Sequence, residues 1–200
     1  MTILGITGPT GAGKSLFSDY LSSVGIPVID ADAVYHSLLL PPSPCLDALR
    51  LAFGDSVLNT DGSLNRPALS EIVFHDKTKL TLLNKTVLGY VLEEIRNRIA
   101  TLKKDGQPTV AIDAPTLIES GFHRECHTVI SVLAPPSVRL ERIIARDGIS
   151  REAAEARLHA QKTDDFYREH STYVLTNCGN KTEFFTQCEA LLKKVELPHS

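Results

Sequence analysis

Short apolar runs alternate with longer stretches of helical spacing along this chain. The apolar runs predict five strands, at residues 3–7, 27–29, 109–112, 128–133 and 173–175. Because these runs are apolar at successive rather than alternate positions, both faces of the sheet must be covered, which is typical of a parallel sheet. A helix is expected from about Lys14 to Val24, where Gly25 ends it. The pattern predicts an α/β fold, a five-stranded parallel sheet flanked by helices.

Two helical insertions interrupt this alternation. Residues 31–108 carry a stripe at helical spacing that predicts one long amphipathic helix, made of Leu80, Leu83, Val87, Val91, Ile95, Ile99 and Leu102. Residues 137–170 hold seven basic and seven acidic residues, which suits either a solvated face or a mobile lid. These patterns therefore divide the chain into an α/β core, from residues 1–30, 109–136 and 171–200, and two helical insertions, 31–108 and 137–170.

Composition narrows the function classes. The chain has 200 residues, 42% hydrophobic and 22% charged, so it can bury a core and is not a disordered chain. A net charge of −3 argues against a general nucleic-acid or membrane-surface binder, and no window approaches the ~18 apolar residues of a membrane span. We expect a soluble cytoplasmic protein that binds neither nucleic acid nor membrane and has no obligate protein partner.

The four cysteines show no metal-binding or disulfide-rich spacing. They predict free thiols in a reducing compartment. The cluster from His123 to His127 lacks a second ligand group at zinc spacing, so we interpret it as a polar loop that enters a strand.

Residues 8–15, Gly-Pro-Thr-Gly-Ala-Gly-Lys-Ser, fit the phosphate-loop motif G-x-x-x-x-G-K-[ST]. The glycines let backbone N–H groups turn around a polyphosphate, and the following helix offers its positive N-terminal end. Lys14 would reach the outer phosphates, and the Ser15 hydroxyl would bind Mg²⁺. The motif lies between a predicted strand and a helix, as the mechanism requires. It predicts a nucleoside triphosphate site made of Gly11, Ala12, Gly13, Lys14, Ser15 and Leu16.

Other motifs favour a small kinase over a switch or a motor. A GTPase needs Asn-Lys-x-Asp, whereas Asn84-Lys85-Thr86 is followed by Val87 and lies inside the long predicted helix. Small kinases need a phosphate loop, an acid beside the acceptor hydroxyl, and arginines that close over the phosphoryl group.

Candidate acids lie where two predicted strands end. After the second strand, Asp30-Ala31-Asp32 offers an acid at the sheet edge where α/β proteins bind ligands. We expect Asp32 to be the catalytic base and Asp30 to cap the following helix or support the site. Asp113 ends the third strand and would either hold Mg²⁺ through water or cap the loop 114–118.

Three arginines of the charged insertion share one helical stripe: Arg139, Arg142 and Arg146. A single arginine there would be surface solvation. Three on one face favour a lid that faces phosphate.

With these motifs in order, the chain resembles the dephospho-coenzyme A kinase family over nearly its whole length. The more specific matches are Ile29-Asp30-Ala31-Asp32 with Tyr35-His36, the run 61–74 from Asp61-Gly62 through Arg66 to Val73-Phe74, Pro115 to Glu119, Arg142 with Arg146-Asp147-Gly148, Arg157 with Gln161, and Val174 to Asn177.

The resemblance implies an adenylate-kinase-like core that binds the nucleotide (residues 1–30, 109–136 and 171–200), with a helical substrate-binding domain over 31–108 and a lid over 137–170. It implies phosphorylation of the ribose 3′-hydroxyl of dephospho-CoA with ATP and Mg²⁺, giving coenzyme A and ADP. It also implies which residues bind: Arg142, Arg146 and Asn177 for ATP, with Arg142 catalytic beside Lys14, and Asp32, Arg66, Leu117 and Glu119 for the acceptor.

The chain departs from the family's pattern at three places. Leu88-Gly89 stands where the family has His-Pro, Thr116 and Ile118 replace Leu and Phe, and Arg139 replaces a common Gln. The first change removes an expected helix kink and affects substrate binding. A P-loop kinase for another small alcohol or nucleoside monophosphate, and a non-catalytic nucleotide-binding protein, are the alternative interpretations.

Overall fold

The computed structural model describes residues 1–195. The chain divides into two compact units, one formed by Met1–Ile29 with the chain from Leu102 onward, and one formed by Asp30–Thr101.

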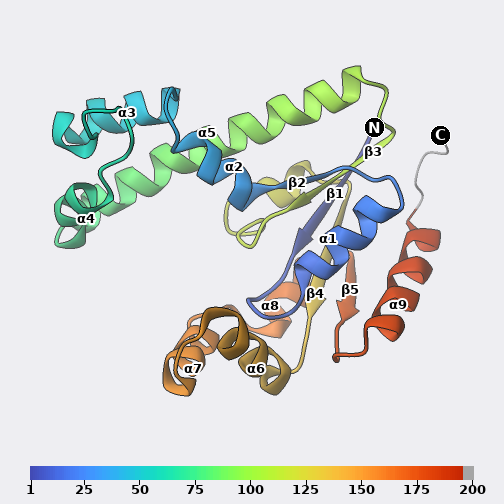
Figure 1. Cartoon of the computed structure of the whole chain (residues 1–200). Helices are drawn as coiled ribbons and strands as arrows, with labels where there is room; N and C mark the ends of the chain where they lie inside the picture. Colours follow the sequence, from blue (N-terminus) through green and yellow to red (C-terminus); the bar gives the residue numbers. More distant parts are fainter. Residues whose placement is uncertain (196–200) are drawn as a thin grey trace. The chain divides into compact units, whose positions relative to one another are not determined.

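The first unit is built on a five-stranded sheet (Figure 1). Its strands are β1 (Thr2–Thr7), β2 (Val28–Asp30), β3 (Thr109–Asp113), β4 (Thr128–Leu133) and β5 (Tyr173–Thr176), in the order β2-β3-β1-β4-β5. The pairs β1–β3, β1–β4 and β4–β5 are parallel, so the expected parallel sheet is confirmed. β1 lies at its centre, which places the carboxyl ends of β1, β3 and β4 side by side.

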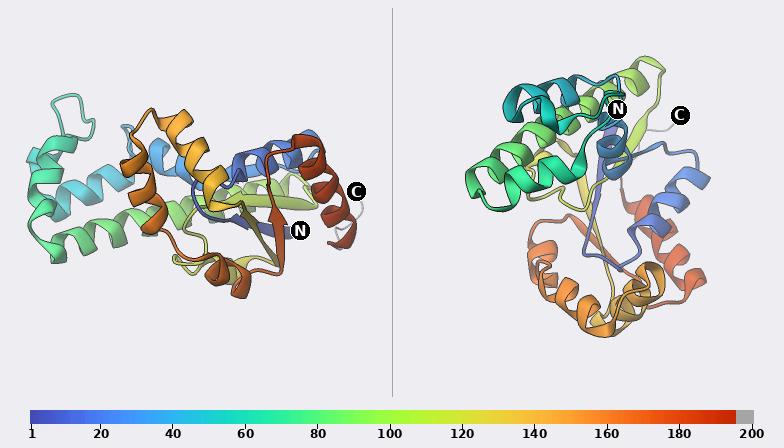
Figure 2. Two further views of the ribbon diagram at one scale, coloured as in Figure 1. Left: turned by 90° about the horizontal axis from the view of Figure 1, so that it is seen from below. Right: turned by 60° about the vertical axis from the view of Figure 1, so that its left-hand side comes forward.

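Helices cover both faces of this sheet (Figure 2). The unit's helices are α1 (Lys14–Ser23), η2 (Phe122–Glu125, a 3₁₀ turn), α6 (Pro136–Asp147), α7 (Arg151–His159), α8 (Asp164–Glu169) and α9 (Lys181–Lys194). On one face, Phe17 of α1 and Phe184 of α9 pack with Leu4 and Ile130 of the strands. On the other, Tyr167 of α8 packs with Leu133 and Ile118. Each such buried apolar side chain contributes about 1.5–3 kcal/mol, and this two-sided burial explains the uninterrupted apolar strands.

The second unit is helical. It holds α2 (Ala31–Leu38), α3 (Pro44–Phe53), η1 (Asp55–Val57), α4 (Arg66–Phe74) and most of α5 (Lys77–Lys104). The long amphipathic helix is confirmed as α5, which runs unbroken through Leu88 and Gly89. Its stripe is buried at Val91 and Ile95, whereas Leu80 at the start of the helix is 43% exposed, so the apolar stripe overestimates the packed face there.

Among the residues described, no helix is both long and apolar enough to cross a bilayer.

Candidate active site

The phosphate loop connects β1 to α1, and its glycines adopt conformations closed to other residues. Gly13 caps α1 with φ 95°. A Cβ at Gly13 would lie 2.2 Å from Nδ2 of Asn177, and a Cβ at Gly11 (φ 76°) would lie 2.8 Å from the carbonyl oxygen of Arg139. Because both positions combine a left-handed backbone with close packing, only glycine fits. The loop is therefore a rigid backbone cradle at a helix N-terminus, the geometry that binds phosphate.

Lys14, Ser15 and Leu16 form the first turn of α1. The Nζ of Lys14 donates a hydrogen bond to the carbonyl of Gly8 (3.0 Å), so its ammonium group arches over the start of the loop. Ser15 is exposed, as a hydroxyl that binds a metal ion must be. Leu16 donates its backbone N–H to the Gly13 carbonyl (3.1 Å), and its side chain packs against the core.

Asp113 ends β3 beside Ile6 of β1, and its carboxylate is held toward α1. Its Oδ2 accepts a hydrogen bond from the hydroxyl of Ser18 (2.7 Å), one turn beyond Lys14 on the same helix. Sequence reasoning did not identify Ser18. The contact fixes the carboxylate of Asp113 beside the helix that carries the phosphate-loop lysine and serine.

Arg142 of α6 links the phosphate loop to the end of β5. Its Nη1 donates to the carbonyls of Gly11 (3.1 Å) and Ala12 (3.2 Å), and its Nη2 donates to Oδ1 of Asn177 (2.9 Å). Asn177 is 2% exposed and donates its Nδ2 to the Ala12 carbonyl (3.1 Å). Two residues assigned to ATP from the resemblance thus lie together against the loop.

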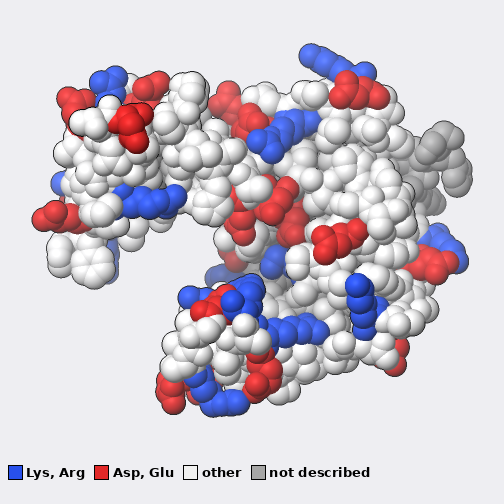
Figure 3. Space-filling model, viewed as in Figure 1, with Lys and Arg blue, Asp and Glu red and all other residues white. Residues whose placement is uncertain are grey.

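Arg146, one turn further along α6, is held by the carboxylate of Asp147. Its Nε and Nη2 reach the two carboxylate oxygens at 2.7 and 3.0 Å, and Arg157 of α7 bonds to the same carboxylate. The hydrogen bonds that Asp147 accepts from Arg146 lower the pKa of the Asp147 carboxyl. Figure 3 shows Lys and Arg side chains gathered over the α6–α7 segment, interleaved with acidic ones. This segment therefore presents guanidinium groups whose orientation is fixed.

Arg139 does not face phosphate as the three-arginine stripe led us to expect. Its side chain is only 6% exposed, and its Nε donates to the Thr10 carbonyl (3.0 Å) beneath the loop. The helical spacing correctly places the three arginines along α6. It does not reveal that the first one is a buried residue.

Asp30 and Asp32 differ in their contacts at the start of α2, in the second unit. Oδ1 of Asp30 accepts hydrogen bonds from the N–H groups of Asp32 (2.8 Å) and Ala33 (3.1 Å). Asp30 is therefore the helix cap, which confirms its structural assignment. Asp32 is exposed in the first turn, and within its unit no described donor holds its carboxylate.

The remaining acceptor-site candidates differ in exposure. Arg66 is exposed at the first turn of α4, where Asn65 caps the helix. Glu119 is exposed in the first unit, close enough to raise the pKa of Tyr167, although burial of Tyr167 is the larger cause. The side chain of Leu117 is fully buried and lies where any Cβ at Gly5 would be. Leu117 is thus a core residue in this structure, in contrast to the predicted substrate contact.

Thr10 and Gln161 are further residues that sequence reasoning did not place in the site. Gln161, between α7 and α8, accepts a hydrogen bond from the N–H of Thr10 through its Oε1 (3.2 Å). Their proximity is non-local, since 151 positions separate them along the chain. The family resemblance, which includes Gln161, was the only available signal.

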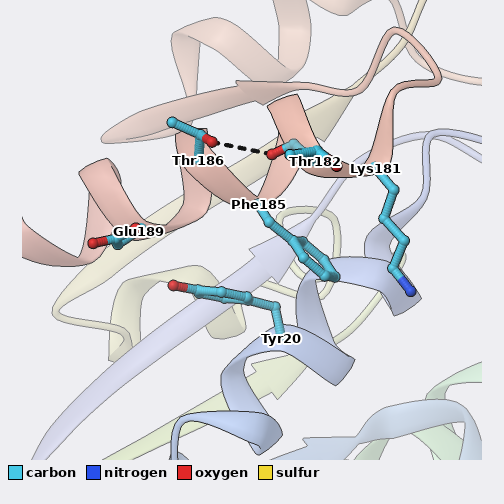
Figure 4. A pocket seen from close by; sticks show the side chains of 6 residues that line it. All are labelled: Tyr20, Lys181, Thr182, Phe185, Thr186 and Glu189. Atoms are coloured by element: carbon cyan, nitrogen blue, oxygen red, sulfur yellow. Dashed lines mark hydrogen bonds between the residues drawn. The ribbon is translucent and has the colours of Figure 1, made fainter.

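A separate surface pocket of about 420 Å³ lies between α1 and α9 (Figure 4). It is lined by Tyr20, Lys181, Thr182, Phe185, Thr186 and Glu189. The rings of Tyr20 and Phe185 are 5.3 Å apart, Lys181 lies over Phe185, and Glu189 pairs with Lys193 (2.7 Å). No phosphate-loop residue lines this pocket, so the candidate nucleotide site is the loop itself.

Comparison with known proteins decides the family. The sequence profile described as dephospho-CoA kinase matches residues 2–183. The chain belongs to the dephospho-CoA kinase family. A dephospho-CoA kinase of Symbiobacterium thermophilum is 38% identical over 190 residues, covering 95% of this chain and 80% of that one. A dephospho-CoA kinase of Bacillus cereus is 34% identical over 192 residues, covering 96% of each chain.

Solved structures agree with this membership of the dephospho-CoA kinase family. A protein of Thermus thermophilus matches with TM-score 0.79 at 32% identity over 97% of each chain. Dephospho-CoA kinase from Campylobacter jejuni matches with TM-score 0.71 at 25% identity over 96% of each chain. A shikimate kinase of Acinetobacter baumannii, at 16% identity and TM-score 0.56 over 98% of this chain and 96% of its own, shares the fold alone.

Proposed function

We propose that this chain transfers the γ-phosphate of ATP to the ribose 3′-hydroxyl of dephospho-CoA, which gives coenzyme A and ADP. One observation carries the proposal at the level of the site: the ammonium of Lys14 and the guanidinium of Arg142 both donate hydrogen bonds to carbonyls of the phosphate loop. Family membership supports the choice of acceptor.

The loop and its cations supply electrostatic stabilisation. Phosphoryl transfer has little covalent chemistry for a protein to perform, so catalysis depends on positioning and on charge at the equatorial oxygens. Backbone N–H groups from Gly11 to Ser15 bind the phosphates, and Lys14 faces the developing charge. Arg142 and Arg146 add positive charge from α6, which is part of the proposed lid over residues 137–170. The adenine lies near Asn177.

The donors around Ser15 fit a magnesium ion. Ser15 is exposed at the loop, and the Asp113 carboxylate is fixed toward the same helix by Ser18. Ser15 would hold Mg²⁺ directly and Asp113 would hold it through water. When bound, the ion neutralises the charge on the β- and γ-phosphate oxygens.

Asp32 is the proposed base. A ribose hydroxyl is a weak nucleophile at neutral pH, and an aspartate can orient it and accept its proton. Exposure of the Asp32 carboxylate supports this role, since Asp30 alone caps the helix. Arg66 and Glu119 are proposed to bind the acceptor. We also propose a cytoplasmic location, which the four free cysteines support.

An acceptor panel tests the proposal. ADP release is measured with ATP, Mg²⁺ and, in turn, dephospho-CoA, shikimate, gluconate and a nucleoside monophosphate. Dephospho-CoA should be the strongly preferred acceptor. Preference for another alcohol would support the alternative kinase, and ATP binding without ADP release on any acceptor would support a non-catalytic protein.

The base is tested by a matched pair. Asp32→Asn should lower kcat by ~100- to 10,000-fold, the range for removal of a general base, with ATP affinity within a few-fold. Asp30→Asn should be much milder, because asparagine caps a helix as well as aspartate does. If Asp30→Asn were the more damaging change, the base would have to be reassigned, with Asp113 the next candidate.

A further inference from the structure

Arg139 is a basic residue that is buried beside the candidate nucleotide site. It belongs to α6, and 6% of its side chain is exposed. Burying a guanidinium is costly unless its donors are bonded and its charge is paired. The bonds that Arg139 makes therefore indicate what it is there to do.

Only one of the guanidinium nitrogens of Arg139 makes a hydrogen bond of ordinary length within the described part of the chain. The Nε donates to the Thr10 carbonyl at 3.0 Å. The Nη1 lies 3.7 Å from Oδ1 of Asp164, which is too long for a hydrogen bond, and the buried Nη2 has no partner in the part of the chain that the structure describes. Burial, the largest cause, lowers the pKa of Arg139. The positive charge of Arg139 is thus poorly compensated, whereas its Nε makes a hydrogen bond of ordinary length.

The bonded carbonyl is at a sensitive point. Thr10 precedes Gly11, whose hydrogen-bearing side lies against the backbone of Arg139, since a Cβ there would be 2.8 Å from the Arg139 carbonyl oxygen. Thr10 is also held at its N–H by Gln161 (3.2 Å) and at its hydroxyl by Arg146 (3.5 Å). Of these three contacts, only the one at the carbonyl comes from a buried side chain, so it fixes the direction in which the next N–H groups of the loop point.

We propose that Arg139 is a positioning residue for the phosphate loop, that it acts by holding the Thr10 carbonyl, and that this requires a donor at the Nε position rather than a positive charge. The proposal rests on the proposed function only in taking the loop as the ATP site. Arg139 touches neither substrate nor reacting atoms in this role; it acts through the loop backbone.

Side-chain geometry separates position from charge. In glutamine the Nε2 is attached to Cδ, as Nε is in arginine, so Arg139→Gln can donate to the Thr10 carbonyl from the same place without a charge. Arg139→Lys keeps the charge but has a methylene at that place, with its ammonium one atom further out. Arg139→Met has similar length and neither donor nor charge. Asp164→Asn removes the weak ion pair and leaves Arg139 in place.

The experiment measures the Kd for ATP by titration without acceptor, steady-state constants for both substrates, and thermal unfolding of each variant. Arg139→Met and Arg139→Lys should raise the Kd and the KM for ATP about fivefold to tenfold, the scale of one lost buried hydrogen bond, with the KM for dephospho-CoA unchanged. Arg139→Gln and Asp164→Asn should stay within about twofold of the parent protein. Thermal unfolding confirms that each variant is folded at the assay temperature.

Three results would overturn the proposal. Rescue by Arg139→Lys and not by Arg139→Gln would mean that the charge acts. Lower unfolding temperatures with an unchanged Kd for ATP would mean a merely structural role. Equal Kd values for all four variants would mean that the Thr10 contact does not position the loop. Since the ATP titration needs no acceptor, a parent protein that binds ATP but does not phosphorylate dephospho-CoA would refute the proposed function and leave this test readable.

Discussion

The buried amide of Asn177 offers the sharpest test of how the site is held together. It accepts hydrogen bonds from Nη2 of Arg142 (2.9 Å) and the N–H of Gly179 (3.3 Å), and it donates to the Ala12 carbonyl (3.1 Å). Asn177→Leu keeps the number of side-chain heavy atoms and removes all three bonds. The substitution therefore removes the hydrogen bonds while it keeps the branched shape of the side chain, in which larger methyl groups replace the amide nitrogen and oxygen.

The loss of stability depends on whether each group that loses its bond to Asn177 finds another hydrogen-bond partner. Arg142 and Gly179 are partly or fully accessible to water, and the Ala12 carbonyl still accepts from Nη1 of Arg142 (3.2 Å). At about 1 kcal/mol for each lost bond, with more for a buried group left unpaired, the total is about 2–4 kcal/mol. For a chain of this size that lowers the unfolding temperature by about 5–15 °C.

The assay is thermal unfolding followed by circular dichroism, together with ATP titration. Asn180→Ala is the matched control, because Asn180 is exposed and caps α9 through the N–H groups of Thr182 and Glu183. Loss of that cap costs about 1 kcal/mol, so the control should unfold about 2–4 °C earlier with an unchanged Kd for ATP. Asn177→Leu should also weaken ATP binding several-fold, because Gly13 packs against the amide. A loss of unfolding temperature no larger than the control's, or an unchanged Kd for ATP, would mean that the Asn177 amide does not hold the loop.

Three further predictions address the loop, the acceptor and stability at alkaline pH. Lys14→Ala should lower kcat ~100- to 1000-fold, as loss of one transition-state contact does; near-normal turnover would rule out the loop assignment. Arg66→Ala should raise the KM for dephospho-CoA, and a change in the KM for ATP alone would mean that Arg66 is misplaced. Burial raises the pKa of Cys188 from 9.0 to about 12, so the unfolded state loses this proton at a lower pH than the folded state does. The free energy of unfolding therefore keeps its full value below pH 9 and falls by up to about 1.4 kcal/mol per pH unit between pH 9 and about 12. Cys188→Ala should reduce the pH dependence of the free energy of unfolding over that range, as measured by urea unfolding at each pH. Cys178→Ala, at an exposed cysteine, is the control, and an equal pH dependence in both variants would contradict the assignment.

Local and periodic features of this protein were predictable from sequence. The strands are apolar because helices cover both sheet faces. The phosphate loop is recognisable in the sequence because its backbone requires glycine at Gly11 and Gly13. The capping role of Asp30 was also predictable, because aspartate is a favoured cap and Asp30 directly precedes the helix.

Non-local contacts were not predictable. The bond between Ser18 and Asp113 joins residues 95 positions apart, and nothing in the spacing of α1 marks Ser18. Helical periodicity placed Arg139 and Arg142 on one face of α6, but only packing decides which guanidinium is buried. Leu117 was assigned to substrate by resemblance, whereas its side chain fills space beside Gly5.

The proposed reaction can be tested at the phosphorylated atom itself. The protein is incubated with ATP, Mg²⁺ and dephospho-CoA, and the acceptor is followed by phosphorus NMR and mass spectrometry, with Lys14→Ala as the inactive control. The proposed reaction gives one new phosphomonoester on the ribose 3′-oxygen, formed in equal amount with ADP. ADP without a phosphorylated acceptor, or phosphate on any other oxygen of dephospho-CoA, would contradict it.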